Sequence, residues 1–264
     1  MRIETCGSGP PLVMIHGWAM HSGVFAPLFP QLASRFTLHL VDLPGHGLSR
    51  DDVTPLSLDA VTAQLLERLP PALWFGWSLG GLFALQAAAL RPDVVRGVLM
   101  HCATPRFVRA ENADDPWKYG VSADIFREFA EGLRNDYRAT LDRFVALEAF
   151  GADAAREALR MLRGDLFARG EPATRALVDG LTMLETADLR AALPPLRVPS
   201  LWLAGRRDRL VDPRAMRMAA DMATDATFAQ IEHAGHAPFL THADEVARHV
   251  VQFADRIGFV DASA

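Results

Sequence analysis

Short, continuous apolar runs recur along this chain, bounded by glycine or proline, with longer helical patterns between them. Runs of this kind suit strands that are buried on both faces of a sheet. The helical patterns imply parallel crossovers, and apolar residues 79–90, which stop at Arg91-Pro92, are the clearest example. We therefore predict an α/β fold in which helices flank a mostly parallel sheet. The predicted strands cover residues 12–15, 36–41, 72–75, 94–100, 199–204 and, more weakly, 227–231.

Residues 106–190 interrupt this alternation of strand and helix patterns, because they contain no clear strand pattern. One set of side chains recurs there at three- and four-residue steps, and all but the last are apolar or aromatic, which predicts one stripe of a long helix. The stripe consists of Phe126, Phe129, Leu133, Tyr137, Leu141, Phe144 and Glu148. Residues 154–162 and 173–184 predict two further helices. We expect an all-helical insertion, either a lid over an active site or a second packing subdomain, within a core formed by residues 1–105 and 191–264.

The chain has 264 residues, enough to bury a sizeable core as one α/β domain with an insertion. Its formal net charge of −5 argues against a general nucleic-acid binder. No segment reaches the roughly 18 consecutive apolar residues of a membrane span, and the N-terminus lacks a signal-like apolar stretch, so we expect a cytoplasmic protein. Cys6 and Cys102 form no C-x-x-C pair, which predicts reduced, buried thiols without a zinc or redox motif, although their spacing leaves a disulfide open.

The segment Gly76-Trp77-Ser78-Leu79-Gly80 has the pattern Gly-x-Ser-x-Gly between a predicted strand and a predicted helix. This is the context of a nucleophile elbow, a sharp turn that exposes the seryl oxygen above a sheet. Glycines two residues to either side leave room for the turn, since a Cβ there would collide with the neighbouring strand or helix. We interpret Ser78 as the nucleophile, with a glycine-rich turn that has no chemistry as the alternative.

The segment His16-Gly17-Trp18 follows the first strong strand. The N–H of Trp18 can therefore face the same point as the N–H of Leu79, which follows the serine. Two such donors stabilise an oxyanion, and the loss of one costs about 3–4 kcal/mol of transition-state stabilisation. We predict an oxyanion hole formed by these two N–H groups, and we interpret His16 as a structural histidine that bonds the loop backbone.

The acid and the histidine should follow the serine along the chain, in that order. His236 lies in a loop between a weak strand and a C-terminal helix, where neighbouring glycine and proline can project its ring over the sheet edge. Asp208 comes directly after the strand at 199–204 and is well placed to hold the tautomer of the imidazole. The rival histidine is His233. The rival acid is Asp212, which looks more like a helix N-cap with Pro213 in the first turn.

Other polar residues in these regions are given structural roles. His242 is expected near the start of the C-terminal helix, and His249 on the surface of that helix. Residues 42–49 form an Asp-Leu-Pro-Gly-His-Gly-Leu-Ser turn after a strand, in which glycine and proline shape the loop. His46 and Ser49 within this turn are therefore not candidates for catalysis.

Together these motifs resemble the α/β-hydrolase superfamily over nearly the whole chain. The likeness is carried by His16-Gly17-Trp18, the turn at 42–49, the Gly-Trp-Ser-Leu-Gly segment and Gly-His-Ala-Pro-Phe at 235–239. Residues 36–45, 76–82, 143–147, 184–190 and 236–239 further resemble the pimeloyl-[acyl-carrier protein] methyl ester esterases of biotin synthesis. That family hydrolyses the methyl ester of pimeloyl attached to acyl carrier protein, which frees the distal carboxylate and ends chain elongation.

The resemblance implies catalysis by Ser78, Asp208 and His236, and the expected acyl transfer needs neither a metal nor an organic cofactor. It also implies substrate contacts from Trp18, Ser78, Leu79, Phe144, Val145, Ala146, Leu147, Glu148 and His236. Lid arginines would dock the acidic carrier protein, and the matching positions are Arg143, Arg156 and Arg160. A fourth family arginine falls on Ala139, with Arg138 beside it, and Ala19 stands where the family often has glycine.

The lid arginines also have a plainer interpretation, because acidic residues share the insertion and a mixed, solvated face would look the same. Other functions stay open as well. A generic carboxylesterase or thioesterase would act on free small molecules, and small esters are expected to serve as surrogate substrates. Dehalogenases and epoxide hydrolases use an Asp nucleophile, which Ser78 argues against. A non-catalytic ligand receptor on a hydrolase scaffold is the alternative of another class. We expect a monomer with no nucleic-acid or membrane partner.

Overall fold

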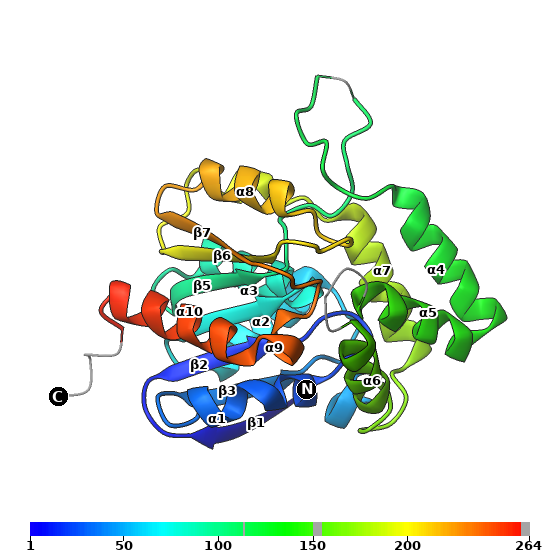
Figure 1. Cartoon of the computed structure of the whole chain (residues 1–264), viewed down its shortest axis with the longest axis horizontal. Helices are drawn as coiled ribbons and strands as arrows, with labels where there is room; N and C mark the ends of the chain where they lie inside the picture. The colour runs from blue at the N-terminus through cyan, green and yellow to red at the C-terminus, as the bar shows by residue number, and fades with distance from the viewer. Residues whose placement is uncertain (113, 150–154, 260–264) are drawn as a thin grey trace.

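The computed structural model describes residues 1–112, 114–149 and 155–259, and Figure 1 shows their arrangement. A seven-stranded sheet has the order β1-β3-β2-β4-β5-β6-β7. β1 pairs antiparallel with β3, and the other pairings are parallel. The strands are β1 (Arg2–Gly7), β2 (Pro11–Ile15), β3 (Thr37–Asp42), β4 (Ala72–Trp77), β5 (Val95–His101), β6 (Ser200–Gly205) and β7 (Ala226–Ile231). The predicted α/β fold with a mostly parallel sheet is confirmed.

Helices cover both faces of this sheet, with α10 on one face and α2 and α3 on the other (Figure 1). The α-helices are α1 (Phe29–Leu32), α2 (Leu58–Arg68), α3 (Leu79–Leu90), α4 (Ala123–Asn135), α5 (Tyr137–Ala149), α6 (Ala155–Leu166), α7 (Thr174–Thr186), α8 (Pro213–Met222), α9 (Pro238–Thr241) and α10 (Ala243–Arg256). Short 3₁₀ helices are η1 (Ser22–Leu28), η2 (Gly47–Ser49) and η3 (Arg190–Ala192). None of the described helices is long and apolar enough to cross a membrane.

All six predicted strands are present, but the sequence interpretation missed β1. All six residues of β1 are exposed or half-buried, so this edge strand lacks the continuous apolar run by which the other strands were predicted. Cys6 lies on β1 and is only half-buried, which corrects the expectation that both cysteines are buried. Cys102, directly after β5, is buried as expected, and both thiols are free.

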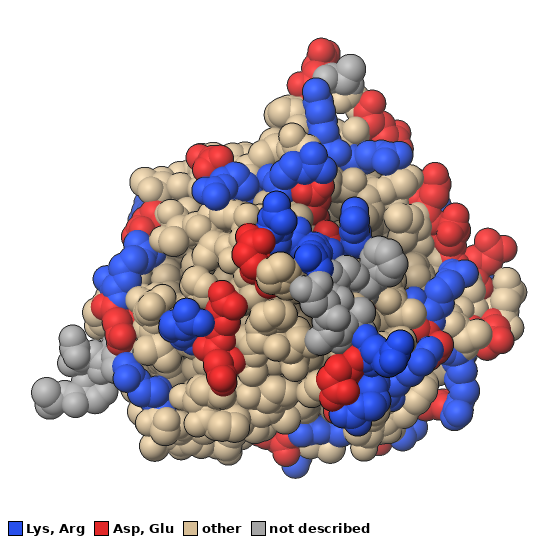
Figure 2. Space-filling view, in the orientation of Figure 1, with Lys and Arg blue, Asp and Glu red and all other residues tan. Residues whose placement is uncertain are grey.

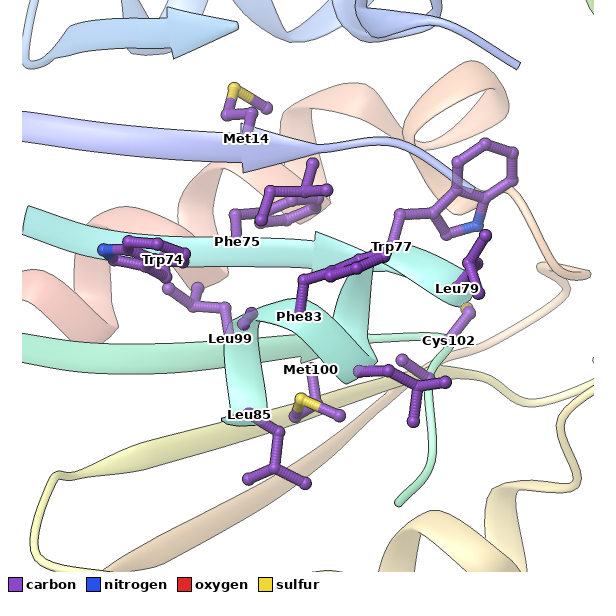
Figure 3. Close-up of a cluster of buried hydrophobic side chains, with 14 of the residues drawn as sticks. Met14, Trp74, Phe75, Trp77, Leu79, Phe83, Leu85, Leu99, Met100 and Cys102 are labelled. Atoms are coloured by element: carbon purple, nitrogen blue, oxygen red, sulfur yellow. The ribbon is translucent and has the colours of Figure 1, made fainter. Parts of the chain in front are cut away.

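The core is centred on β4 and the neighbouring elements α3 and β5 (Figure 3). Every residue of β4 is buried, which is what a strand covered on both faces requires. Phe75 and Trp77 of β4 lie in the same apolar cluster as Phe83 of α3 and Leu99 of β5. This packing fixes the carboxyl end of β4 and the first turn of α3, where the predicted nucleophile stands.

The predicted long helix is wrong, because the structure has two helices, α4 and α5, that meet at Asp136. The backbone of Asp136 is extended, with φ −151° and ψ 90°. Its carboxylate accepts the N–H of Ala139 at 3.1 Å, so this residue ends one helix and caps the next. The helices cross closely where a Cβ on Gly132 would lie 2.6 Å from Thr140 Oγ1. The apolar spacing continues through the break, which is why periodicity alone did not reveal it.

Helices α4–α7, called the helical segment below, stand between β5 and β6 in the chain and lie beyond the carboxyl ends of the parallel strands (Figure 1). The two further predicted helices correspond to α6 and α7. Ala154, the predicted start of the first of these, lies outside the described residues, and α6 is described from Ala155. α4 packs on α7 and α5 packs on α6, so the segment forms its own compact layer.

Candidate active site

Ser78 stands at a sharp turn between β4 and α3, with φ 52° and ψ −121°. A positive φ is strained for a residue that has a side chain, and such strain is common at functional turns. The surrounding chain passes very close by. A Cβ on Gly76 would lie 2.5 Å from Gly81 Cα, and a Cβ on Gly80 would lie 2.2 Å from Ile15 O. Only glycine fits at these two positions, as the Gly-x-Ser-x-Gly pattern predicts.

The structure brings the three predicted side chains together at the carboxyl edge of the sheet. His236 Nε2 lies 2.9 Å from Ser78 Oγ, and His236 Nδ1 lies 2.8 Å from Asp208 Oδ2. All three residues are buried, with 4 % of Ser78, 1 % of His236 and 5 % of Asp208 exposed. In such a series the imidazole can take the proton of the hydroxyl while the carboxylate orients the ring.

Asp208 is held by the loop that follows β6. Its Oδ1 accepts the backbone N–H groups of Leu210 at 2.8 Å and Val211 at 3.0 Å, which leaves Oδ2 to the imidazole. Because a carboxylate only accepts hydrogen bonds, we assign the ring proton to Nδ1. The lone pair of Nε2 then faces the seryl hydroxyl, which is the tautomer that a general base needs.

The rival residues lie elsewhere. The ring of His233 is 3.0 Å from Arg207 Nη2 rather than beside the serine. Asp212 caps α8 with its side chain, as expected. His242 directly precedes α10, as expected, but His249 is not a plain surface residue. It is half-buried in that helix, and burial lowers its pKa below the ordinary value.

The predicted oxyanion donors lie beside Ser78. A Cβ on Gly17 would be 3.1 Å from Ser78 Cβ, so the loop that leads to Trp18 passes directly next to the serine. Leu79 is the first residue of α3, where an N–H has no partner within the helix. Neither the Trp18 N–H nor the Leu79 N–H donates to another residue in the described part of the chain. Two buried N–H groups are thus available near the seryl oxygen.

His16 has the structural role that the sequence suggests. Its Nε2 accepts the N–H of Leu43 at 3.0 Å, so the proton is on Nδ1, which donates to Gly17 O at 2.8 Å. Burial lowers the pKa of His16 to about 3, which keeps the ring neutral. Asp42, at the start of the adjacent turn, accepts two backbone N–H groups. These bonds shape the loops around the site.

The helical segment rests on the side chain of Trp18. The ring of Phe144 on α5 meets the indole edge-on, with 4.6 Å between centroids. The indole Nε1 donates to Leu177 O on α7 at 2.8 Å, and a Cβ on Gly180 would lie 2.7 Å from Trp18 Cδ1. Phe144, the first residue of the predicted substrate stretch, therefore contacts Trp18, whose N–H is one of the predicted oxyanion donors. The next three residues on α5 range from buried to half-buried: Val145, Ala146 and Leu147.

Glu148 has an unusual environment for a carboxyl group. It follows Phe144 by one helical turn on the same face of α5 and is 1 % exposed. Neither of its carboxyl oxygens has a hydrogen-bond partner among the residues that the structure describes. Burial, reinforced by the charge of Asp208, raises the pKa of Glu148 well above its usual range. The fold therefore favours the protonated, neutral carboxyl.

Replacing Glu148 with glutamine is expected to stabilise the protein above about pH 4.3, the ordinary pKa of glutamate. Since the folded pKa is raised, wild type takes up a proton on folding, and its free energy of unfolding falls until pH reaches that raised pKa. The slope is about 1.4 kcal/mol per pH unit. Thermal unfolding of both proteins across pH measures it. Glu128→Gln, on the exposed surface of α4, is the control, and parallel curves for wild type and Glu148→Gln would contradict the account.

The predicted docking arginines lie on α5 and α6 and are mostly engaged. Arg138 forms an ion pair with Glu171. Arg143 stacks over the Phe129 ring at 5.0 Å. The remaining two lie on α6: Arg160 pairs with Glu157 at 2.6 Å, and Arg156 is exposed. The mixed, solvated face that the sequence suggests is therefore present at these positions.

Cys102 lies beside the candidate site, although the sequence interpretation assigned this residue only to the core. It has φ 44°, and potential ligand atoms of Cys102, Asp208 and His236 all lie within 4.8 Å of one another. Burial raises the pKa of the Cys102 thiol well above its usual range, so the thiol is protonated. The hydrogen bond between the carboxylate and Nδ1 already engages two of the three groups. Its position directly after β5, at the same sheet edge, is the sequence signal that could have placed Cys102 near the site.

Comparison with known proteins places the chain in a family. Residues 10–243 match the family model described as the alpha/beta hydrolase fold. Among solved structures, an esterase from Exiguobacterium antarcticum superposes with a TM-score of 0.83 at 20 % identity, covering 96 % of this chain and 94 % of that one. A bromoperoxidase from Bacillus anthracis gives 0.82 at 22 %, with the same coverage. The chain belongs to the α/β-hydrolase family.

Curated relatives identify a narrower family within the α/β-hydrolases. The pimeloyl-[acyl-carrier protein] methyl ester esterase of Stenotrophomonas maltophilia strain R551-3 is 56 % identical over 253 residues, 96 % of each chain. The protein of the same name from Xanthomonas oryzae pv. oryzae strain MAFF 311018 is 54 % identical, over 96 % of this chain and 98 % of its own. Within the hydrolases, the chain belongs to the family of pimeloyl-[acyl-carrier protein] methyl ester esterases.

Proposed function

We propose that this chain is a serine carboxylesterase that hydrolyses the methyl ester of pimeloyl-[acyl-carrier protein] in biotin synthesis. The observation that carries the proposal is the hydrogen-bonded series from Ser78 Oγ through His236 to Asp208, with distances of 2.9 and 2.8 Å. The substrate is taken from the name of relatives that are 56 % and 54 % identical. The products are the free acid on the carrier protein and methanol.

In the first half of the reaction, His236 Nε2 takes the proton of Ser78 as Oγ attacks the ester carbonyl carbon. The N–H groups of Trp18 and Leu79 stabilise the oxyanion of the tetrahedral intermediate. The imidazolium, which Asp208 stabilises and orients, then gives its proton to the methoxy oxygen. The carbon–oxygen bond of the ester breaks, methanol leaves, and an acyl-serine remains.

In the second half, water attacks the acyl-serine. His236 takes a proton from this water and returns one to Ser78 Oγ, which leaves the carboxylic acid on the acyl chain. Every proton moves between the substrate, water and these side chains. The steps therefore call for no metal or organic cofactor.

In this proposal, residues 106–190, which include the helical segment, form a lid domain. Residues 1–105 and 191–264 form the catalytic core. Phe144 and its neighbours through Glu148 cover the acyl chain, since this face of α5 rests on Trp18. Arg143, Arg156 and Arg160, with Arg138 near the fourth position, contact the acidic carrier protein. The enzyme acts in the cytoplasm as a monomer and accepts small esters as surrogate substrates.

The direct test is a hydrolysis assay on monomethyl pimelate, both free and as the thioester of acyl carrier protein. Release of methanol from the carrier-bound ester, with the larger kcat/KM for that form, is the expected result. A generic esterase on free small molecules would show no preference for the carrier. A folded protein that cleaves neither ester would favour the non-catalytic receptor and would overturn the proposal.

A further inference from the structure

Glu148 differs from the acidic side chains on the surface of the helical segment. Figure 2 shows acidic and basic side chains side by side on the outside of α4 and α6, where solvent screens their charges. Glu148 instead is 1 % exposed, and neither oxygen of its carboxyl group has a hydrogen-bond partner in the described part of the chain. Because buried polar atoms nearly always have such a partner, this carboxyl group is suited to bind a small polar molecule.

Three observations place Glu148 over the candidate site. Phe144, one helical turn earlier on the same face of α5, packs edge-on against Trp18, with 4.6 Å between ring centroids. α6, which packs on α5, also packs on α9, the helix that begins two residues after His236. The charge of Asp208 reaches Glu148, since it contributes to the raised pKa of that carboxyl group. Glu148 therefore lies where the helical segment covers the histidine and the oxyanion donors.

The second half of the proposed reaction uses a water molecule whose two O–H groups have different fates. One O–H gives its proton to His236 Nε2 as the oxygen attacks the acyl carbon. The other O–H stays intact, becomes part of the product acid, and needs an acceptor in a buried site. A neutral carboxyl group offers a carbonyl oxygen as that acceptor, and burial keeps Glu148 neutral by raising its pKa. Methanol, which leaves in the first half, carries a methyl group in place of this second O–H and needs no such acceptor.

Building on the proposed function, we propose that Glu148 binds the water molecule that hydrolyses the acyl-serine. Its carbonyl oxygen accepts the O–H that is not transferred, which turns the other O–H toward His236 and a lone pair of the water oxygen toward the acyl carbon. Glu148 itself neither gains nor loses a proton. When the tetrahedral intermediate collapses, the bond from carbon to Ser78 Oγ breaks, and His236 returns its proton to that oxygen. Glu148 thus assists the second half of the reaction and leaves the formation of the acyl-serine to the other groups.

The test compares two acceptors for the same acyl-serine. Wild type and variants hydrolyse p-nitrophenyl butanoate in buffer with added methanol, and the initial yields of methyl butanoate and butanoate give the ratio of methanolysis to hydrolysis. In Glu148→Leu, which has a similar size but no acceptor oxygen, we expect this ratio to rise roughly tenfold. In Glu148→Gln, whose amide oxygen can accept the same O–H, the ratio should stay within about twofold of wild type. The rate of p-nitrophenol release in the first turnover should be unchanged in both variants.

Controls separate this role from packing and from the proposed function. Glu128→Leu makes the same chemical change on the exposed surface of α4 and should leave the ratio unchanged. If Glu148→Leu does not fold, Glu148→Met, whose flexible side chain has a similar length, replaces it. An unchanged ratio in the folded apolar variant, or an equal change in Glu148→Gln, would overturn the role of Glu148. A protein that cleaves the p-nitrophenyl ester but not the carrier-bound ester would contradict the proposed function alone, and a protein that cleaves neither ester would contradict both.

Discussion

Ser78→Ala is expected to lower kcat for ester hydrolysis by about 10⁶-fold, as the loss of a catalytic serine does in a comparable triad. The nucleophile is gone, and the remaining donors and pocket can only assist direct attack by water. KM should change far less than kcat, because the hydroxyl is a small part of the binding surface. Steady-state kinetics on free monomethyl pimelate measure both quantities.

The control for this variant is Ser57→Ala. Ser57 caps α2 by accepting the N–H of Ala60 at 3.2 Å, and it is not part of the hydrogen-bonded series of Ser78, His236 and Asp208. Its loss should reduce the free energy of unfolding by about 1 kcal/mol and leave kcat unchanged. If a folded Ser78→Ala protein kept more than a hundredth of wild-type kcat, the assignment of Ser78 as the nucleophile would be wrong.

Asp208→Asn has the second-largest expected effect, a fall in kcat of about 10⁴-fold. The carboxylate that accepts from His236 Nδ1–H would be replaced by an amide that can donate to the ring. The imidazole would then favour the tautomer whose proton is on Nε2, which cannot accept the proton of Ser78. Substrate contacts are untouched, so KM should move little.

Asp212→Asn is the matched control, because Asp212 is the rival acid in the same loop. Its carboxylate caps α8 by accepting the N–H of Arg214 at 2.8 Å, and asparagine is an equally good cap. We therefore expect near wild-type kcat and stability. A loss in Asp212→Asn as large as that in Asp208→Asn would mean that the acid has been assigned to the wrong residue.

Local features of the sequence were enough to predict the sheet and the three converging side chains. Buried strands are continuous apolar runs, and the order Ser78, Asp208, His236 places one group after each of three strands whose carboxyl ends meet at one edge. β1 was not predicted because it lies at the sheet edge with most of its side chains exposed. The end of α4 at Asp136 was not predicted because a capping residue can end a helix while the apolar spacing of the side chains continues.

Tertiary contacts decided what the sequence left open. Glu148 occupies a step of the apolar stripe, but spacing could not show that its carboxyl group is buried without a partner near Asp208. The run Arg206-Arg207-Asp208-Arg209 is visible in the sequence, yet only the fold shows that the acid turns inward and the exposed arginines line a hollow. Cys102 likewise lies close to Asp208 because β5, which precedes the cysteine, pairs with β6, which precedes the aspartate.

The most direct test of the central claim, that His236 and Asp208 activate Ser78, is covalent labelling by a fluorophosphonate. Wild type should incorporate one label per chain, and peptide mass spectrometry should place it on Ser78. Ser78→Ala should take up none, and Asp208→Asn should react far more slowly. A folded wild-type protein that stays unlabelled, or that carries the label on another residue, would contradict the account.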